Sequence, residues 1–434
     1  YVAAAPVPTR TGTTEAGRVR GRAPRNHGCR TVLLSTILAG LPVSISVPAR
    51  SHQSAGGKLA NVADLVAIDL PGGPQFVQQL RAAWDEGSAV APLDQRLAPP
   101  ARERLLDVLR PAWVVTRDGR LPRPAGLPVD DGDALVVPTG GSTGDAKAAV
   151  LTHAAVKASA LATSERLEVD PAKHRWLACL PLSHIGGLSV VTRSILTGAP
   201  LSVLNGFDAA AVTAAGGPDV LVSLVPTALA RINPSVFYRI LLGGSEPPPS
   251  LPPNVVTTYG MTETGSGVVY DGMPLRGVEI SISPAGEVLL RCPMLLRAYR
   301  DGRAPVDAEG WFPTGDAGHL DGQGRLQVDG RLSDMVITGG ENVWPIAVER
   351  ILRQHPGVDE VAVSGRPDPE WGERVVAFVV PADATAPPGL EELRALVRAE
   401  LAAYAAPKEL VLVSCLPKTP IGKLRRGALR QQLR

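Results

Sequence analysis

Aromatic residues are scarce in this chain of 434 residues, since Phe, Trp and Tyr together make up only 4% of it. Hydrophobic residues nevertheless account for 44% of the sequence, an ordinary share for a globular protein. The core must therefore be built mainly from Ala, Val and Leu side chains. Because a chain of this length exceeds a single compact core, we expect two or three domains.

Cysteine is also rare, and its spacing argues against two kinds of site. The four cysteines lie far apart and match neither a metal-ligand pattern nor a paired disulfide framework. They are Cys29, Cys179, Cys292 and Cys415. This usage is typical of buried thiols in a reducing compartment, so we expect a cytoplasmic protein.

Neither sign of charge dominates, because 44 Lys and Arg residues oppose 42 Asp and Glu residues, for a formal net charge of +2. This balance argues against nucleic acid as an obligate partner of the whole chain. No uninterrupted apolar run reaches the roughly 18 residues that span a bilayer, so we expect no stable membrane insertion.

The first 60 residues contain a single acidic residue, Glu15, among many Arg, Pro, Gly and Ser residues. Residues 31–49 are apolar and follow several arginines, as in a secretory signal, but Pro42 and several hydroxyl residues interrupt them. We expect residues 1–60 to be a poorly ordered extension or sequence upstream of the true start. An export signal is the alternative.

From Asn61 onward, strand-like apolar runs alternate with segments of helical spacing, which predicts an α/β domain with mostly parallel sheets. After about residue 277 the hydrophobic period changes to two around tight turns, as in antiparallel hairpins. We therefore predict a large domain over residues 61–330 and a small, mobile α+β domain over residues 331–434. The clearest strand candidates are 133–139, 175–181, 199–204, 219–226 and 239–244.

Residues 139–147 form a segment of small and hydroxyl residues that ends in Lys147. Glycines let a backbone approach an anion, and successive N–H groups can bind phosphate. The segment is not the common mononucleotide loop GxxxxGK[ST], because Ala146 precedes the lysine and Ala148 follows it. The alternative is a simple surface loop.

Two further segments place polar side chains among glycines. In residues 257–267, Tyr259 could offer a flat surface, Thr262 a phosphate donor and Glu263 a Mg²⁺ ligand. In residues 310–326, we expect Asp316 at a strand end, where it could accept hydrogen bonds from a ribose diol. For residues 257–267 the alternative is a polar turn, and for Asp316 it is a residue that caps a turn.

The last two segments are residues 330–352 and 418–429. The first begins at the predicted boundary between the large and the small domain, with Arg331 at the junction, where a hinge is expected. In the second, a Pro-Ile-Gly turn frames Lys423. A basic tail is the alternative there, because several arginines follow.

Together the segments TGGSTGDAK, YGMTE, GWFPTGD, GRLSDMVITGGENVWPIAVE and PIGK resemble the adenylate-forming family of acyl-CoA synthetases, luciferases and adenylation domains. All five occur in the family's order, over about residues 62–434. The resemblance implies ATP and coenzyme A as co-substrates, Mg²⁺ as a cofactor and, as a further possibility, a homodimer.

The resemblance also assigns roles to residues. Those that contact ATP phosphates are Thr139, Ser142, Thr143, Gly144 and Lys147, with Thr262 on the α-phosphate and Glu263 on Mg²⁺. Those that line the adenine slot and hold the ribose are Gly243, Gly244, Ser245, Tyr259, Asp316 and Arg331. Lys423 bridges the acyl carboxylate and the phosphate during adenylation. Leu332 and Ser333 form the hinge, and Gly339 and Gly340 flank the pantetheine tunnel.

The segment 180–201 bears on the acid that is activated. Its pattern HIxGLSxxxRxxxxG is most similar to o-succinylbenzoate–CoA ligases of menaquinone biosynthesis, in which His184 resembles the residue that gates the acyl pocket. Arg193 would lie about two helical turns beyond His184 and could pair with a second carboxylate of the substrate. The alternative is an arginine that caps or salt-bridges a surface helix.

We therefore expect an acid–CoA ligase in which Lys423, Thr262, Glu263 and His184 carry catalysis. A medium-chain or aryl acid is the alternative substrate. A non-catalytic acyl-nucleotide binder is a second class, which would have no need of Lys423. A kinase-type NTPase is a third, and the missing GK[ST] pair argues against it.

Overall fold

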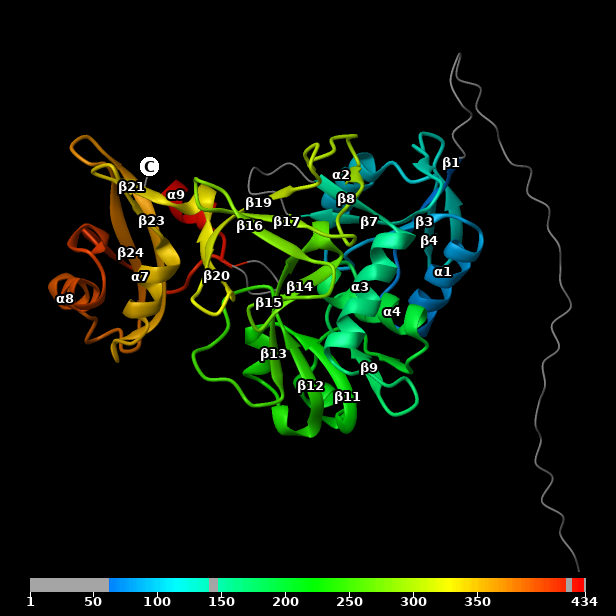
Figure 1. Ribbon diagram of the computed structural model, residues 1–434, viewed down its shortest axis with the longest axis horizontal. Coiled ribbons are helices and arrows are strands. Elements are labelled where there is room, and N and C mark those ends of the chain that lie inside the picture. The colour runs from blue at the N-terminus through cyan, green and yellow to red at the C-terminus, as the bar shows by residue number, and fades with distance from the viewer. Residues whose placement is uncertain (1–61, 140–146, 419–423, 433–434) are drawn as a thin grey trace, which may run out of the picture. The chain divides into compact units, whose positions relative to one another are not determined.

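A computed structural model describes residues 62–139, 147–418 and 424–432 (Figure 1). The chain from Ala60 onward forms one compact unit. It contains two large sheets, an antiparallel sheet and a smaller C-terminal sheet, in addition to a short two-stranded pair. That pair joins β1 (Val62–Ala63) to β6 (Val129–Asp130).

The first large sheet has the strand order β18-β8-β7-β3-β2-β4-β5. Its central neighbours β7, β3, β2 and β4 are parallel, and its edge pairs are antiparallel. Two helices follow its first strands, α1 (Pro74–Asp85) and α2 (Pro99–Leu109). The strands are β2 (Leu65–Ile68), β3 (Ala89–Pro92), β4 (Trp113–Thr116), β5 (Gly119–Pro122), β7 (Asp133–Thr139), β8 (Lys147–Thr152) and β18 (Ala298–Tyr299).

The second large sheet has the order β10-β9-β11-β12-β13-β14-β15, parallel as far as β13 and antiparallel beyond it. Its strands are β9 (Arg175–Ala178), β10 (Leu201–Val203), β11 (Gly217–Leu224), β12 (Phe237–Leu242), β13 (Val255–Met261), β14 (Ser266–Tyr270) and β15 (Met273–Pro274). The helices in this region are α3 (His153–Arg166), α4 (Ile185–Thr197), α5 (Ala209–Ala214) and α6 (Pro226–Leu229), with the 3₁₀ turn η1 (Pro234–Val236). Helices α3 and α4 pack side by side, and one hydrophobic core includes residues of both sheets and both helices (Figure 1).

The antiparallel sheet consists of β16 (Glu279–Ile282), β17 (Glu287–Arg291), β19 (Phe312–Leu320) and β20 (Leu326–Arg331). It follows the change to a period of two that the sequence shows near residue 277. Antiparallel hairpins are present as predicted, since β16 pairs with β17 and β19 pairs with β20.

The C-terminal part has five strands and hydrophobic cores of its own within residues 336–429. Its strands are β21 (Val336–Thr338), β22 (Glu341–Val343), β23 (Val358–Asp368), β24 (Gly372–Pro381) and β25 (Glu409–Leu412). Its helices are α7 (Pro345–Leu352), α8 (Leu390–Glu400) and α9 (Arg426–Gln432), with the 3₁₀ turns η3 (Leu332–Asp334) and η4 (Ala403–Ala405). The predicted α+β character is therefore confirmed, whereas the mobility of this part stays a prediction.

The predicted strand over residues 133–139 coincides with β7. The prediction of mostly parallel sheets holds for the centres of both large sheets but not for their edges. Between β7 and β8 lie only residues 140–146. That connection is too short for the crossover that parallel neighbours require, so β8 turns back beside β7 as an antiparallel strand.

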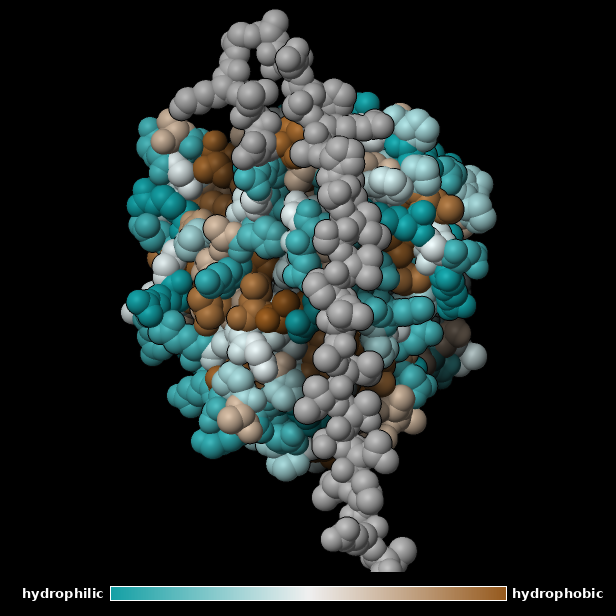
Figure 2. Space-filling view, turned by 90° about the vertical axis from the view of Figure 1, so that its right-hand side faces the viewer, coloured by the Kyte–Doolittle hydropathy of each residue, from teal (hydrophilic) through white to brown (hydrophobic). Residues whose placement is uncertain are grey.

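On the face shown in Figure 2, hydrophobic residues gather in patches between hydrophilic ones. Within the part of the chain that the structure describes, no helix combines the length and hydrophobicity needed to cross a membrane.

Candidate active site

The predicted phosphate segment connects two paired strands. Thr139 ends β7 and lies opposite Lys147, the first residue of β8. The Nζ atom of Lys147 lies 5.7 Å from the centroid of the Tyr299 ring. The predicted ligands Ser142, Thr143 and Gly144 lie outside the described residues. The described ends of the segment thus hold the hydroxyl of Thr139 and the charge of Lys147 on neighbouring strands.

Thr262 and Glu263 lie in the 3₁₀ turn η2 (Thr262–Thr264), between β13 and β14. The phenol of Tyr299 donates a hydrogen bond to Oε1 of Glu263 at 3.0 Å. Burial raises the pKa of Tyr299, and the neighbouring Glu263 charge raises it further, so the phenol stays protonated and remains a donor. Because Tyr299 contacts both Glu263 and Lys147, it joins two segments that the sequence predicts as separate.

Tyr259, Asp316 and Arg331 form a second cluster. The Tyr259 hydroxyl donates to Oδ2 of Asp316 at 2.9 Å, and Nε of Arg331 lies 2.8 Å from the other carboxylate oxygen. Asp316 and Arg331 are direct partners in the β19–β20 register. The expectation that Asp316 lies at a strand end is wrong, since it lies inside β19, where the Arg331 pair holds its carboxylate.

The predicted adenine slot follows β12, beside the strand that carries Tyr259. A Cβ on Gly243 would lie 2.4 Å from the side-chain hydroxyl of Thr258, so any other residue at this position would have to displace that side chain. Gly244 has a φ of +89°, a conformation that side chains disfavour. Ser245 follows with an exposed side chain. Two residues without side chains therefore lie beside the strand that carries Tyr259, which leaves room for the flat ligand that is predicted there.

His184 is the residue before α4, and two charged residues that follow β3 contact its ring. Nη2 of Arg96 lies 3.1 Å from Nε2 of His184, and an Asp94 oxygen lies 3.6 Å from the same nitrogen. Burial alone would raise the pKa of Asp94, but hydrogen bonds with His184 and Arg96 outweigh burial and hold the pKa far below its ordinary range. Asp94 is thus ionised and restrains the predicted gate residue.

Arg193 lies on α4, two turns beyond His184, as predicted, but its environment was not foreseen. Its side chain is 1% exposed and lies over the Trp176 ring at 4.7 Å. Nη2 donates to the hydroxyls of Ser266 at 2.9 Å and Ser189 at 3.4 Å, whereas Nε and Nη1 have no hydrogen-bond partner within the described ranges. The alternative of a salt-bridging surface arginine is therefore wrong. Burial lowers the pKa of Arg193 from its ordinary value, which reflects the cost of this position.

Gly339 and Gly340 form the turn between β21 and β22. Their φ angles of +61° and +84° fit the tight turn type that glycine favours in two-residue hairpins. The turn packs against the indole of Trp371, which a Cβ on Gly339 would approach to 2.8 Å. The predicted hinge residues Leu332 and Ser333 lie in η3, between β20 and β21. Lys423 lies outside the described residues.

Several residues in these contacts are absent from the site predicted by sequence, among them Tyr299, Asp94, Arg96 and Trp371. Asp94 and Arg96 had a signal, because they follow a parallel strand, and ligands of α/β sheets bind beyond the carboxyl ends of strands. Tyr299 and Trp371 had none beyond their own aromatic character. Their partners come from segments far along the chain.

Two family models match this chain. Residues 122–299 match the model of the AMP-binding enzyme, and residues 347–423 match the model of the AMP-binding enzyme C-terminal domain. The first matched region contains the phosphate segment, η2 and Tyr299, and the second contains most of α7 and ends at Lys423.

Three known proteins illustrate the similarity. A probable 2-succinylbenzoate–CoA ligase of Mycobacterium tuberculosis is 39% identical over 375 residues, which cover 79% of this chain and 95% of that protein. The indoleacetate–CoA ligase of Aromatoleum aromaticum is 34% identical over 406 residues, which cover 82% of this chain and 77% of that protein. The structure of o-succinylbenzoate CoA synthetase from Bacillus subtilis with its acyl-adenylate intermediate has a TM-score of 0.74 at 27% identity, with 85% of this chain and 88% of that chain covered.

These similarities extend over both the large α/β part and the C-terminal part, in agreement with the order of the five segments. The chain therefore belongs to the adenylate-forming family of AMP-binding enzymes, in the group that contains acid–CoA ligases.

Proposed function

We propose that this protein is a 2-succinylbenzoate–CoA ligase of menaquinone biosynthesis. It activates the acid with ATP as an acyl-adenylate, releases pyrophosphate and transfers the acyl group to the thiol of coenzyme A. The observation that carries the choice of acid is Arg193, a buried cation two helical turns beyond His184, two of whose nitrogens have no partner among the described residues. The similarity to 2-succinylbenzoate–CoA ligases supports the same choice.

The argument from Arg193 is one of charge. An ionised group is costly to bury unless an opposite charge accompanies it. Among the described residues, the contacts of Arg193 are two hydroxyls and an aromatic ring, none of which carries a negative charge. 2-Succinylbenzoate has one carboxylate to activate and a second to anchor. In the proposed complex the second carboxylate accepts from the free face of the guanidinium, in the two-pronged geometry that arginine favours.

The first half-reaction joins two anions, so cations must offset their charge while they hold the reacting atoms in line. Lys147 and the predicted phosphate ligands act on ATP, and Asp316 and Arg331 act on its ribose. Glu263 would hold a Mg²⁺ ion, which commonly takes one carboxylate and phosphate oxygens, and the hydrogen bond from Tyr299 restrains this carboxylate. When bound, the ion would offset phosphate charge.

The second half-reaction is assigned to a different orientation of the C-terminal part, reached by rotation at Leu332 and Ser333. Lys423 acts in the first half-reaction and withdraws for the second. The Gly339–Gly340 turn then flanks the pantetheine arm of coenzyme A. Separation of the two steps keeps the reactive adenylate away from water. A cytoplasmic location, a homodimer and a dispensable segment 1–60 stay predictions.

Acid-dependent exchange of labelled pyrophosphate into ATP tests the first half-reaction, since a kinase-type enzyme or a non-catalytic binder would not support it. Thioester formation with coenzyme A should then be compared for 2-succinylbenzoate, indoleacetate, a medium-chain acid and benzoate. We expect the highest kcat/KM for 2-succinylbenzoate. A preference for indoleacetate would favour an aryl acid–CoA ligase, which the 34% identical relative supports as the second candidate. Absence of exchange with every acid would refute the enzyme itself.

A further inference from the structure

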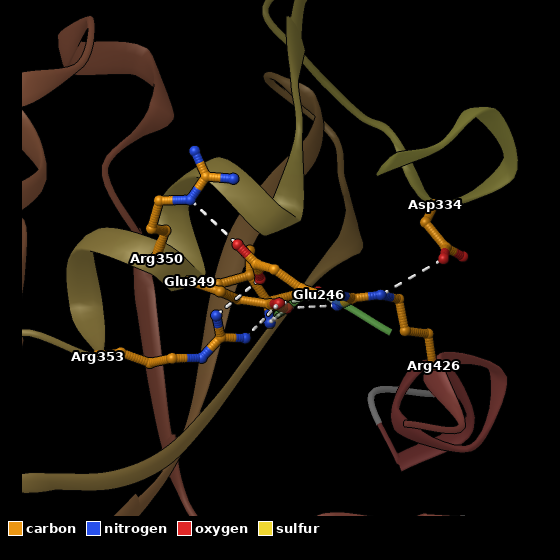
Figure 3. Close-up of polar contacts among 7 residues, drawn as sticks. Glu246, Asp334, Glu349, Arg350, Arg353 and Arg426 are labelled. Atoms are coloured by element: carbon orange, nitrogen blue, oxygen red, sulfur yellow. Dashed lines mark hydrogen bonds and ion pairs between the residues drawn. The ribbon is translucent and has the colours of Figure 1, made fainter. Parts of the chain in front are cut away.

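Glu246 connects the adenine slot to the C-terminal part of the molecule. It follows Ser245 directly, and its carboxylate accepts hydrogen bonds from two arginines of α7 (Figure 3). Nε of Arg350 lies 3.0 Å from Oε1, and Nη1 of Arg353 lies 2.8 Å from Oε2. We call these three residues the Glu246 cluster.

The cluster continues into a chain of ion pairs inside the C-terminal part (Figure 3). Nη2 of Arg353 lies 3.4 Å from Glu349, a carboxylate that is only 2% exposed. Glu349 accepts from both terminal nitrogens of Arg426, one of them at 2.9 Å, and also from the backbone N–H of Val363 at 2.7 Å. Nε of Arg426 lies 3.4 Å from Asp334, the last residue of η3.

This series of ion pairs joins three places that the proposed reaction uses. Glu246 is next to the adenine slot, Asp334 is next to the hinge residue Ser333, and Arg426 follows Lys423 by three positions in the sequence. We propose that Glu246 is a positioning residue, which holds the C-terminal part, through Arg350 and Arg353, in the orientation used for adenylate formation. The inference rests on the proposed two-step function.

The exposure of the members fits a contact that forms and breaks in each cycle. The arginine side chains of the Glu246 cluster are 62% and 45% exposed, whereas Arg426 is 14% exposed. Exposed ion pairs are weak and are screened by salt, so the two pairs together bias an equilibrium by a factor of about 3–10. The buried Glu349–Arg426 pair cannot separate at such low cost, because separation would leave a buried charge unpaired. The contact between the two parts of the chain is therefore the reversible one.

The test compares the two half-reactions in Glu246→Gln, which keeps the shape of the side chain and removes its charge. We expect pyrophosphate exchange to fall about 3–10-fold, with no loss of thioester formation from supplied acyl-adenylate and coenzyme A. The wild-type exchange rate should also fall more with added salt than the variant rate. Glu391→Gln is the matched control, because Glu391 pairs with Arg394 and Arg398 on a single helix and should change neither rate.

A second variant separates positioning from a direct effect on the nucleotide. Arg350→Gln/Arg353→Gln alters the far side of the contact and should give the same shift, and addition of Glu246→Gln should lower exchange no further. Additive losses, equal loss in both half-reactions or selective loss of thioester formation would each overturn the proposal. Failure of the proposed function is distinct, because wild-type protein would then lack acid-dependent exchange.

Discussion

The phenol of Tyr299 donates a hydrogen bond to the Glu263 carboxylate, with 3.0 Å between Oη and Oε1. The two residues are 36 positions apart, on β18 at the edge of the first sheet and in the turn that follows β13 of the second. This bond fixes one oxygen of the proposed Mg²⁺ ligand. It also places the Tyr299 ring beneath Lys147.

Tyr299→Phe should therefore impair the Mg²⁺-dependent reaction more than it lowers the stability of the fold. A hydrogen bond to a charged group is worth about 1.5–3 kcal/mol, so we expect pyrophosphate exchange to fall roughly 10-fold or more and the Mg²⁺ requirement to rise. Exchange measured over a Mg²⁺ titration checks this. Tyr404→Phe, at an exposed tyrosine of the C-terminal part, is the control and should leave both values unchanged. An unaltered Mg²⁺ requirement in Tyr299→Phe would contradict the role given to this bond.

Arg193→Met should separate stability from substrate use. Methionine fills a similar volume without a buried charge, so the melting temperature of the ligand-free protein should equal or exceed that of wild type. The lost bidentate pair should lower kcat/KM for 2-succinylbenzoate by about 30–150-fold, mainly through KM. 2-Succinylbenzoate should raise the melting temperature of wild type and not that of the variant. Wild-type kinetics in Arg193→Met would show that the residue is structural.

Lys423→Ala should abolish adenylate formation and preserve thioester formation. Loss of a cation that stabilises the transition state costs on the order of 10²–10³-fold or more in rate. Thioester formation from supplied acyl-adenylate should persist, because the proposal withdraws Lys423 from that step. Single-turnover assays of each half-reaction provide the measurement. Equal damage to both steps would argue against two orientations.

Asp94→Asn should reduce stability in a pH-dependent way. The pKa of Asp94 is lowered in the folded state, so its contribution is fully present above the unfolded value of about 3.9 and is lost as pH falls below it. Urea unfolding should show a constant deficit in the variant at pH 5–7 and a shrinking deficit toward pH 3. The exposed carboxylate of Asp85 offers a control in Asp85→Asn. A deficit independent of pH would rule out the ionised form as the stabilising one.

Thiol labelling of the native protein should be selective. Burial raises the pKa of Cys179 to about 12 and that of Cys292 to about 11, so at pH 8 about one Cys292 side chain in a thousand is a thiolate. Cys415 is exposed. A maleimide followed by mass spectrometry should label Cys415 rapidly, the half-buried Cys292 slowly and the buried Cys179 only after unfolding in guanidinium. Equal rates at Cys292 and Cys415 would contradict this.

Much of the local structure was predictable, for reasons that act over short windows. Residues 133–139 form a strand because a continuous apolar run ends at a proline and a glycine-rich segment, and the structure has β7 over the same residues. Helix α1 follows from apolar residues at helical spacing after Pro74, and its buried residues include Phe76 and Leu80. The antiparallel edges of the sheets were not foreseen, because strand direction depends on which strands become neighbours.

The family follows from local sequence alone, through the order of the five segments and their hydroxyl, glycine and charged residues. The position of Arg193 two turns beyond His184 follows in the same way, because helical spacing is local. Two features instead depend on how the chain packs: Arg193 is buried without an acidic partner among the described residues, and Glu246 contacts Arg353 across 107 positions. Propensity and turn chemistry act within a few residues, whereas burial and ion pairing depend on how distant segments pack, which no local pattern specifies.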